Sequence, residues 1–212
     1  MKYTGRITAL IIMITAIVVM RLYAYMYLKY PLTAFPMIGV IFLFFAFKAG
    51  ENCDKVRFLS EKDSLTECHN RRFVNKIFPT LLAQMNNKNE ELSLAILDCD
   101  NFKTINDTYG HNRGDFILRE ISALLLTSIR KSDMVARWGG DEFLIIAPYA
   151  DRKDIKAIVN RFENELLKLS KKLQIDISVS SGCATYPRDA KKIDDLIHFA
   201  DSNMYDGKSK RI

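Results

Sequence analysis

A pair of glycines between two short apolar segments limits what the second half of this chain can form. Residues 133–137 and 143–147 have the pattern of strands, and Gly139-Gly140 separates them. We predict a tight hairpin, because the turns that best join two twisted strands need positive φ, which glycine adopts readily. Two acids, Asp141 and Glu142, lead from this turn into the second strand. A hairpin alone explains the glycines but not the acids.

A second group of acids follows another apolar segment, residues 92–97, where Asp98 and Asp100 stand at the end of a predicted strand. Buried carboxylates without partners cost free energy, so a cation is expected there. A few oxygen ligands completed by substrate phosphates suit Mg²⁺. Capping of the next helix near Asn101 is an alternative that explains one acid, not both. Two acid-tipped strands side by side suit metal-assisted phosphoryl transfer, with Lys103 as a further cation.

The apolar periodicity that follows Asp63 predicts alternating helices and strands. The expected helices cover residues 70–87, 114–130, 152–172 and 193–205, and the expected strands cover 92–97, 133–137, 143–147 and 175–184. The central elements then run β-α-β-β-α-β, which predicts an α+β fold with a split, ferredoxin-like core.

The first 47 residues have a different character, since they contain four basic residues and no acid. Two uncharged apolar runs, residues 7–20 and 32–47, dominate this part. A helix that crosses a bilayer needs about 20 residues, and the first run reaches that length if Arg21 extends its charge to the interface. We therefore predict a two-helix transmembrane hairpin over residues 1–47.

The turn of this hairpin is expected near residues 29–31. Basic residues before the first run and after the second favour a multi-pass topology with both ends in the cytoplasm. A cleaved signal peptide over residues 1–28 is the alternative. Residues 48–62 are polar and are predicted to be a connecting helix, and residues 63–212 are predicted to be the catalytic domain.

The overall charge of +6 is shared between these parts, and no basic stripe interleaved with aromatics stands out. Nucleic-acid binding is therefore not expected. The four cysteines form no Cys-x-x-Cys pair and the three histidines are scattered. Neither a zinc site nor a disulfide framework is predicted.

Four motifs in the second part resemble those of one family. The segment Arg137-Trp-Gly-Gly-Asp-Glu-Phe143 is similar to the GGDEF signature of diguanylate cyclases. The other three motifs are Asp63 to Arg72, Asp98 to Asp115, and Ala200-Asp201 with Tyr205 and Lys208. The resemblance covers the chain from Asp63 onward and implies a nucleotide cyclase or palm-like fold.

The resemblance implies that two GTP molecules are condensed into cyclic di-GMP with release of two pyrophosphates, in a homodimer of facing subunits. Two Mg²⁺ ions per active site are implied, with Mn²⁺ as a substitute. Asp98, Asp141 and the backbone carbonyl of Cys99 would be metal ligands. Asp141 would also accept the proton of the 3′-hydroxyl. Glu142 would hold the second metal or orient Lys103, which would stabilise phosphate charge.

The resemblance also implies a set of residues that bind the nucleotide. Gly139 and Gly140 would approach the triphosphate, and Lys208 would bind it. The implied base contacts are Asn106, His111 and Asp115. A carboxylate at Asp115 would accept both donors of the guanine edge, which favours GTP over ATP. The alternative is that Asn106 and Asp115 only cap the helix expected from residue 114.

A product-binding inhibitory site is implied at Arg130 and Asp133, with Arg161 as its second arginine. Arginine forks suit phosphates and guanine edges. The alternative is that Arg130 only neutralises the C-terminal end of a helix. The implied location is the cytoplasmic membrane of a bacterium.

The chain departs from the family pattern at two places. Glu67-Cys68 replaces a usual Gly-Leu, and Ile212 stands where a phosphate-binding arginine is usual. The main alternative function is a catalytically silent domain that binds GTP or cyclic di-GMP. Silent members typically lose the acids of the turn, whereas Asp141 and Glu142 are present here, so the active enzyme is favoured.

Overall fold

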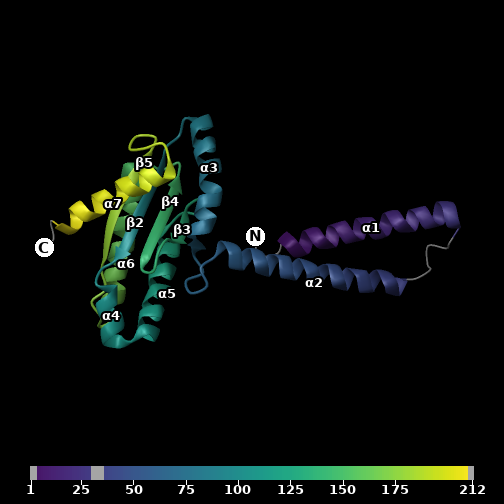
Figure 1. Cartoon of the computed structure of the whole chain (residues 1–212), viewed down its shortest axis with the longest axis horizontal. Coiled ribbons are helices and arrows are strands. Elements are labelled where there is room, and N and C mark those ends of the chain that lie inside the picture. The colour runs from purple at the N-terminus through teal and green to yellow at the C-terminus, as the bar shows by residue number, and fades with distance from the viewer. Residues whose placement is uncertain (1–3, 30–35, 210–212) are drawn as a thin grey trace. The chain divides into compact units, whose positions relative to one another are not determined.

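The computed structural model describes residues 4–29 and 36–209, without the side chains of residues 28, 36–38, 57–59 and 206–209. The chain divides into two compact units, Met1–Ser60 and Glu61–Ile212. Figure 1 shows the first as a pair of long helices and the second as a sheet covered by helices.

A five-stranded sheet forms the centre of the unit 61–212. Its strands are β1 (His69–Asn70), β2 (Leu92–Cys99), β3 (Met134–Arg137), β4 (Glu142–Pro148) and β5 (Val179–Tyr186). They lie in the order β1-β3-β4-β2-β5, and every pair is antiparallel except β1 with β3. Strand β2 therefore lies between β4 and β5 with a neighbour on each side, and six of its residues in succession are buried.

Helices cover both faces of this sheet (Figure 1). They are α3 (Arg71–Lys88), α4 (Phe102–Tyr109), α5 (His111–Ser128), α6 (Arg152–Leu173) and α7 (Ile193–Ser209). One apolar core lies between the sheet and helices α4, α5 and α6, and a second lies between the sheet and helices α3 and α7. Alternate residues of β2, such as Leu94 and Ala95, enter opposite cores.

The predicted β-α-β-β-α-β core is confirmed, and the four predicted strands and the four predicted helices of this unit are all present. The prediction missed β1, which has two residues, and α4. Helix α5 begins at His111 rather than at residue 114, because its first turn is polar and gives no apolar signal. The last strand begins at Val179 rather than at residue 175.

The segment before β5 shows why that strand was predicted too long. Ile175 and Ile177 are buried and so resemble strand residues. Their backbone groups instead meet the side chain of Ser170, whose hydroxyl donates to the Ile175 carbonyl and accepts from the Ile177 N–H. Burial of these residues thus comes from packing beneath α6 rather than from sheet pairing.

The N-terminal unit consists of α1 (Thr4–Leu28) and most of α2 (Pro36–Glu61). Its helices meet where the start of α1 contacts the later half of α2. A side chain on Gly50 would come within 2.7 Å of the Gly5 carbonyl oxygen, so glycine permits this approach. Asp54 accepts the N–H groups of Gly5 and Arg6 at 2.6 and 3.1 Å and thereby caps the first turn of α1.

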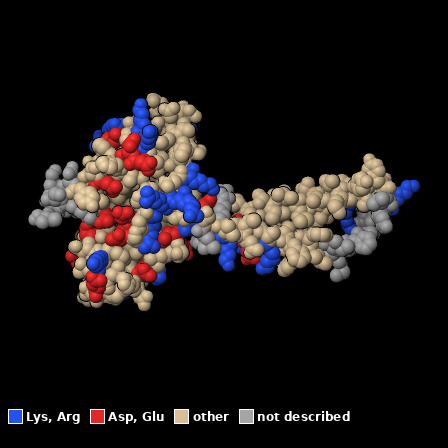
Figure 2. All heavy atoms as spheres, in the orientation of Figure 1, with Lys and Arg blue, Asp and Glu red and all other residues tan. Residues whose placement is uncertain are grey.

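Within the described residues, one helix is long and apolar enough to cross a membrane, over Thr4–Tyr27. The predicted pair of spans is therefore not supported. Helix α2 is apolar only in its first half, because Lys48, Glu51 and Asp54 follow, and part of the second predicted run lies outside the described residues. Figure 2 shows that uncharged side chains cover most of the visible surface of α1 and α2.

Candidate active site

The two acidic motifs meet at one end of the sheet. Strands β2 and β4 pair in a register that sets Asp98 opposite Glu142. Beyond this pair, the Cys99 N–H donates to the Asp141 carbonyl at 3.2 Å. The register therefore gathers the residues that the sequence assigned to metal binding, and it does so with backbone pairing rather than with flexible loops.

The carboxyl groups at this end influence one another. Burial raises the pKa of Glu142, and the charges of Asp98, Asp201 and Asp141 raise it further, whereas Arg71 opposes them. Burial likewise raises the pKa of Asp201, and Asp98 adds to the effect. Such crowding of acids destabilises their charged forms and favours a bound cation.

Asp201 was not among the site residues predicted from the sequence, although it stands in the motif of the last helix. It reaches the site because α7 packs closely on β5. A side chain at Gly182 would collide with the Ala200 carbonyl oxygen, so the glycine permits this approach. An acid immediately after the apolar contact at Ala200 was the available signal.

The turn between β3 and β4 differs from the predicted one. Neither Gly139 nor Gly140 has a positive φ, since Gly110 is the one glycine with that conformation among the described residues. Glycine is needed at position 139 for another reason, because a side chain there would collide with the Glu142 carboxylate. Around Gly140 there is open space, in keeping with a turn that a ligand can approach.

The Arg137 side chain connects this turn to Asp63. Its Nε and Nη2 atoms donate to the Gly140 carbonyl at 3.0 and 2.6 Å, and its Nη1 atom donates to Asp63 at 3.0 Å. Burial acts to raise the pKa of Asp63, but hydrogen bonds from Thr66 and Arg137 outweigh it and hold the pKa below its usual value. The glycine turn is thus tied to the segment that opens the domain.

Asp100 has a structural partner in β5 rather than a capping role. Its two carboxylate oxygens accept hydrogen bonds from Ser178 at 2.8 Å and Ser180 at 2.6 Å. Asn101, which precedes α4, makes no side-chain capping bond. Capping of α4 therefore does not account for the acids, and Asp100 connects the ends of β2 and β5.

Apart from Gly139 and Gly140 in the turn, the residues predicted to bind the nucleotide lie on α4, α5 and α7. Gly114 lacks a side chain where the Asn106 amide oxygen packs against it, so α4 and α5 approach closely. Asp115 is the fifth residue of α5, which argues against a role as a first-turn acid. His111 and Lys103 are exposed at the starts of α5 and α4. The Lys208 side chain lies outside the described residues, as does Ile212.

The predicted product site is also assembled locally. Asp133 is buried and accepts the Arg130 N–H at 2.9 Å, which closes a tight turn after α5. The Arg130 guanidinium pairs with Asp154 of α6 at 3.2 Å. Arg161 donates to the carbonyl of Ser128, the last residue of α5. Arg161, not Arg130, therefore binds the terminal carbonyl of this helix.

The donor set at the acidic end suits a magnesium ion. Within the described ranges, no three His, Cys, Asp or Glu side chains form a preassembled metal cluster. Mg²⁺ does not require one, because it takes one or two protein carboxylates and fills its shell with water and phosphate oxygens. Asp98, Asp141 and the Cys99 carbonyl supply oxygen ligands of the right kind.

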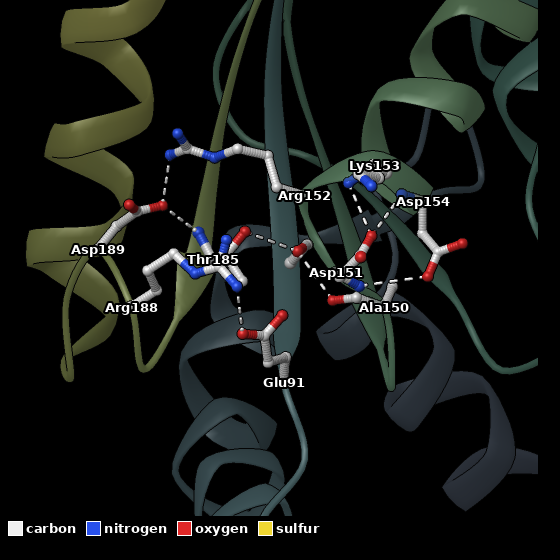
Figure 3. Close-up of polar contacts among 10 residues, drawn as sticks. Glu91, Ala150, Asp151, Arg152, Lys153, Asp154, Thr185, Arg188 and Asp189 are labelled. Atoms are coloured by element: carbon white, nitrogen blue, oxygen red, sulfur yellow. Dashed lines mark hydrogen bonds and ion pairs between the residues drawn. The ribbon is translucent and has the colours of Figure 1, made fainter.

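The opposite end of the sheet carries a different polar network (Figure 3). Asp189 accepts from Arg152 at 2.7 Å and from the Thr185 N–H at 2.7 Å. Arg188 pairs with Glu91 at 3.0 Å. Each of these carboxylates has a cation or an N–H as its partner.

Comparison with known proteins places these features in one family. Residues 60–211 match the family described as diguanylate cyclase, GGDEF domain. The chain is 39% identical over 152 residues to the diguanylate cyclase DosC of Escherichia coli (strain K12), which covers 70% of this chain and 33% of that protein. It is 37% identical over 150 residues to the diguanylate cyclase TpbB of Pseudomonas aeruginosa, with 69% and 34% covered. The chain thus spans about a third of the length of these curated relatives.

Solved structures agree with this assignment. The isolated GGDEF domain of PA1120 (TpbB or YfiN) from Pseudomonas aeruginosa superposes with a TM-score of 0.63 at 33% identity, covering 70% of this chain and 89% of that one. The coiled coil and GGDEF domain of DgcB from Caulobacter crescentus, in complex with c-di-GMP, gives 0.66 at 25% identity, with 76% and 86% covered. This chain belongs to the GGDEF diguanylate cyclase family.

Proposed function

We propose that this chain synthesises cyclic di-GMP from two GTP molecules, with release of two pyrophosphates. The observation that carries the proposal is the register that sets Asp98 opposite Glu142, beside the glycine turn. Burial and the charges of Asp98, Asp201 and Asp141 raise the pKa of Glu142, which a purely structural turn would not require.

The proposed chemistry needs divalent metal at this end of the sheet. Asp98, Asp141 and the Cys99 carbonyl would hold Mg²⁺, two ions per site, with Mn²⁺ as a substitute. Bound metal would offset the charge of the phosphates and favour the attacking alkoxide. Asp141 is the proposed acceptor of the 3′-hydroxyl proton, and Glu142 would hold the second ion or orient Lys103.

The proposed substrate is GTP because of the groups on α4 and α5. The Asp115 carboxylate would accept two hydrogen bonds from the guanine edge, and Asn106 and His111 would contact the nucleotide. Adenine lacks the paired donors, so bound ATP would leave the Asp115 carboxylate without hydrogen-bond partners. Gly139, Gly140 and Lys208 would contact the triphosphate.

The reaction joins two nucleotides, so we propose a homodimer in which each subunit presents one GTP. Arg130, Asp133 and Arg161 form the proposed inhibitory site for the product. The close placement of these residues in the turn after α5 and on α6 supports this assignment. Helix α1 is proposed to anchor the chain in the membrane, with the unit 61–212 in the cytoplasm.

The deciding experiment incubates the full chain, purified in detergent, with GTP and Mg²⁺ and identifies the product by mass spectrometry. We expect cyclic di-GMP from the native chain and none from Asp141→Asn. Asp107→Asn, an exposed change on α4, is the matched control and should retain synthesis. If the native chain is folded and dimeric and binds GTP but forms no product, the proposed cyclase activity is rejected and the catalytically silent binding domain is favoured.

A further inference from the structure

Arg71 occupies a defined position beside the glycine turn. It is the first residue of α3, directly after β1. Strand β1 runs parallel to β3 with Asn70 opposite Arg137, which brings together the residues that follow the two strands, Arg71 and Trp138. The Arg71 guanidinium lies over the Trp138 ring, with 4.5 Å between its central carbon and the ring centroid.

Trp138 is a fixed platform for this arginine. Its backbone N–H donates to the Glu142 carbonyl at 2.8 Å, and its ring packs against the core between the sheet, α3 and α7. A guanidinium stacked on an aromatic face is held in place while its N–H groups point outward in the plane of the fork. The platform therefore orients the arginine without using its donors.

The donors of Arg71 are available to a ligand. The side chain is exposed, and it makes no hydrogen bond or ion pair with any residue in the described part of the chain. Its charge nevertheless acts on the Glu142 carboxylate, which lies against Gly139. An oriented cation thus lies near a turn that is open at Gly140, and near a Glu142 carboxylate on which three other acids act.

We propose that Arg71 is a substrate-binding residue whose guanidinium contacts the β- and γ-phosphates of the nucleotide at the Gly139-Gly140 turn. This inference rests on the proposed function for its substrate class. A planar fork that donates two parallel hydrogen bonds matches the geometry of phosphate oxygens. Trp138 acts as the positioning residue, because the Arg71 guanidinium lies over its ring.

The test measures binding of GTP and of GMP to the full chain in detergent. Arg71→Ala should weaken GTP binding roughly tenfold to a hundredfold and leave GMP binding almost unchanged, because charge-assisted bonds to the outer phosphates are lost. Arg71→Lys keeps the charge but lacks the planar guanidinium, so its affinity for GTP should lie between those of Arg71→Ala and the native chain. Arg72→Ala removes the same charge from the next, exposed residue and should bind both ligands as the native chain does.

The outcomes separate this inference from the proposed function. Equal weakening of GTP and GMP in Arg71→Ala, or no weakening of either, would overturn the phosphate contact. A native chain that binds GTP in an Arg71-dependent way but forms no cyclic di-GMP would uphold the contact and reject the enzyme. Thermal unfolding of each variant shows whether it is folded. If Arg71→Ala does not fold, the GTP and GMP affinities of Arg71→Lys test the phosphate contact instead.

Discussion

The two ends of the sheet in the unit 61–212 carry polar networks of opposite kinds. At the end drawn in Figure 3, Asp189 pairs with Arg152, and backbone N–H groups lower the pKa of Asp151. At the other end, burial and neighbouring acids raise the pKa of Glu142 and Asp201. The same interior strand, β2, connects the two ends.

This difference indicates that polar contacts stabilise the folded state at the paired end and destabilise it at the acidic end. A carboxylate with a matched donor favours the folded state, whereas one crowded by other acids disfavours it. Groups of the second kind persist where a ligand completes them. The acidic end is therefore expected to respond to substitution in activity, and the paired end in stability.

Among the substitutions that compare the two ends, Glu142→Gln should have the largest effect. The amide preserves shape but removes a charge that the proposed metal and phosphate chemistry needs, so cyclic di-GMP synthesis should fall by roughly 100-fold or more. The free energy of unfolding of the metal-free protein should stay equal or rise, because repulsion from Asp98 and Asp201 is removed. Product formation and denaturant unfolding are measured on the same preparation. A clearly destabilised variant would contradict the assignment of this end.

Asp189→Asn is the counterpart at the paired end. The Asp189 carboxylate is largely buried and accepts two hydrogen bonds, and the Arg152 Nε atom is already buried without a partner among the described residues. We expect a loss of about 1–3 kcal/mol in the free energy of unfolding. Synthesis per folded molecule should not change. A selective loss of synthesis at native stability would erase the distinction between the two ends.

The pH dependence of stability should differ in sign between the ends. The raised pKa of Glu142 means that its charged form costs stability at neutral pH, and this cost disappears as pH falls toward the ordinary value of 4.5. The lowered pKa of Asp151 means that its contribution is present at neutral pH and is lost only as pH falls below the ordinary value of 3.8.

Melting temperatures in chelator measure this prediction. The advantage of Glu142→Gln over the native chain should shrink between neutral pH and 4.5. The disadvantage of Asp151→Asn should remain nearly constant over that window, because Asp151 stays charged there. Parallel curves for all three proteins would remove the electrostatic basis of the comparison.

The sequence predicted the elements and most site residues because apolar periodicity and acid placement are local signals. Asp98 and Glu142 were assigned to one site before their register was known. The predicted conformation of the turn was wrong. Glycine is needed at position 139 because a side chain there would collide with Glu142, and not because φ is positive. That constraint is a contact across the turn, which no turn propensity contains.

Features that depend on packing between distant segments were not predictable. Asp201 joins the site only because α7 lies against Gly182. Arg71 meets Trp138 through pairing of a two-residue strand that has no sequence signal. Glu67, which replaces a usual glycine, has a left-handed backbone with a φ of 57°, a conformation that glycine adopts more readily.

The smallest effect concerns the paired end, where Arg130 of the proposed product site contacts Asp154. Cyclic di-GMP would have to displace this carboxylate before its phosphate could bind the guanidinium. Both side chains are about half exposed, so the pair is worth only about 0.2–1 kcal/mol. Asp154→Asn weakens the pair and should strengthen feedback inhibition by cyclic di-GMP by about twofold to fivefold.

The matched control for this last prediction lies on the same helix. Glu165 forms an exposed ion pair with Lys168 at 2.7 Å, away from the Arg130 turn, so Glu165→Gln removes a similar charge without touching the proposed product site. Inhibition constants are compared for both variants and for Arg130→Ala, which should lose inhibition. If Asp154→Asn and Glu165→Gln shift inhibition equally, the effect is one of net charge alone. If only Asp154→Asn shifts it, the ion pair is an internal competitor of the product, and pairing at this end of the sheet moderates feedback as well as stabilising the fold.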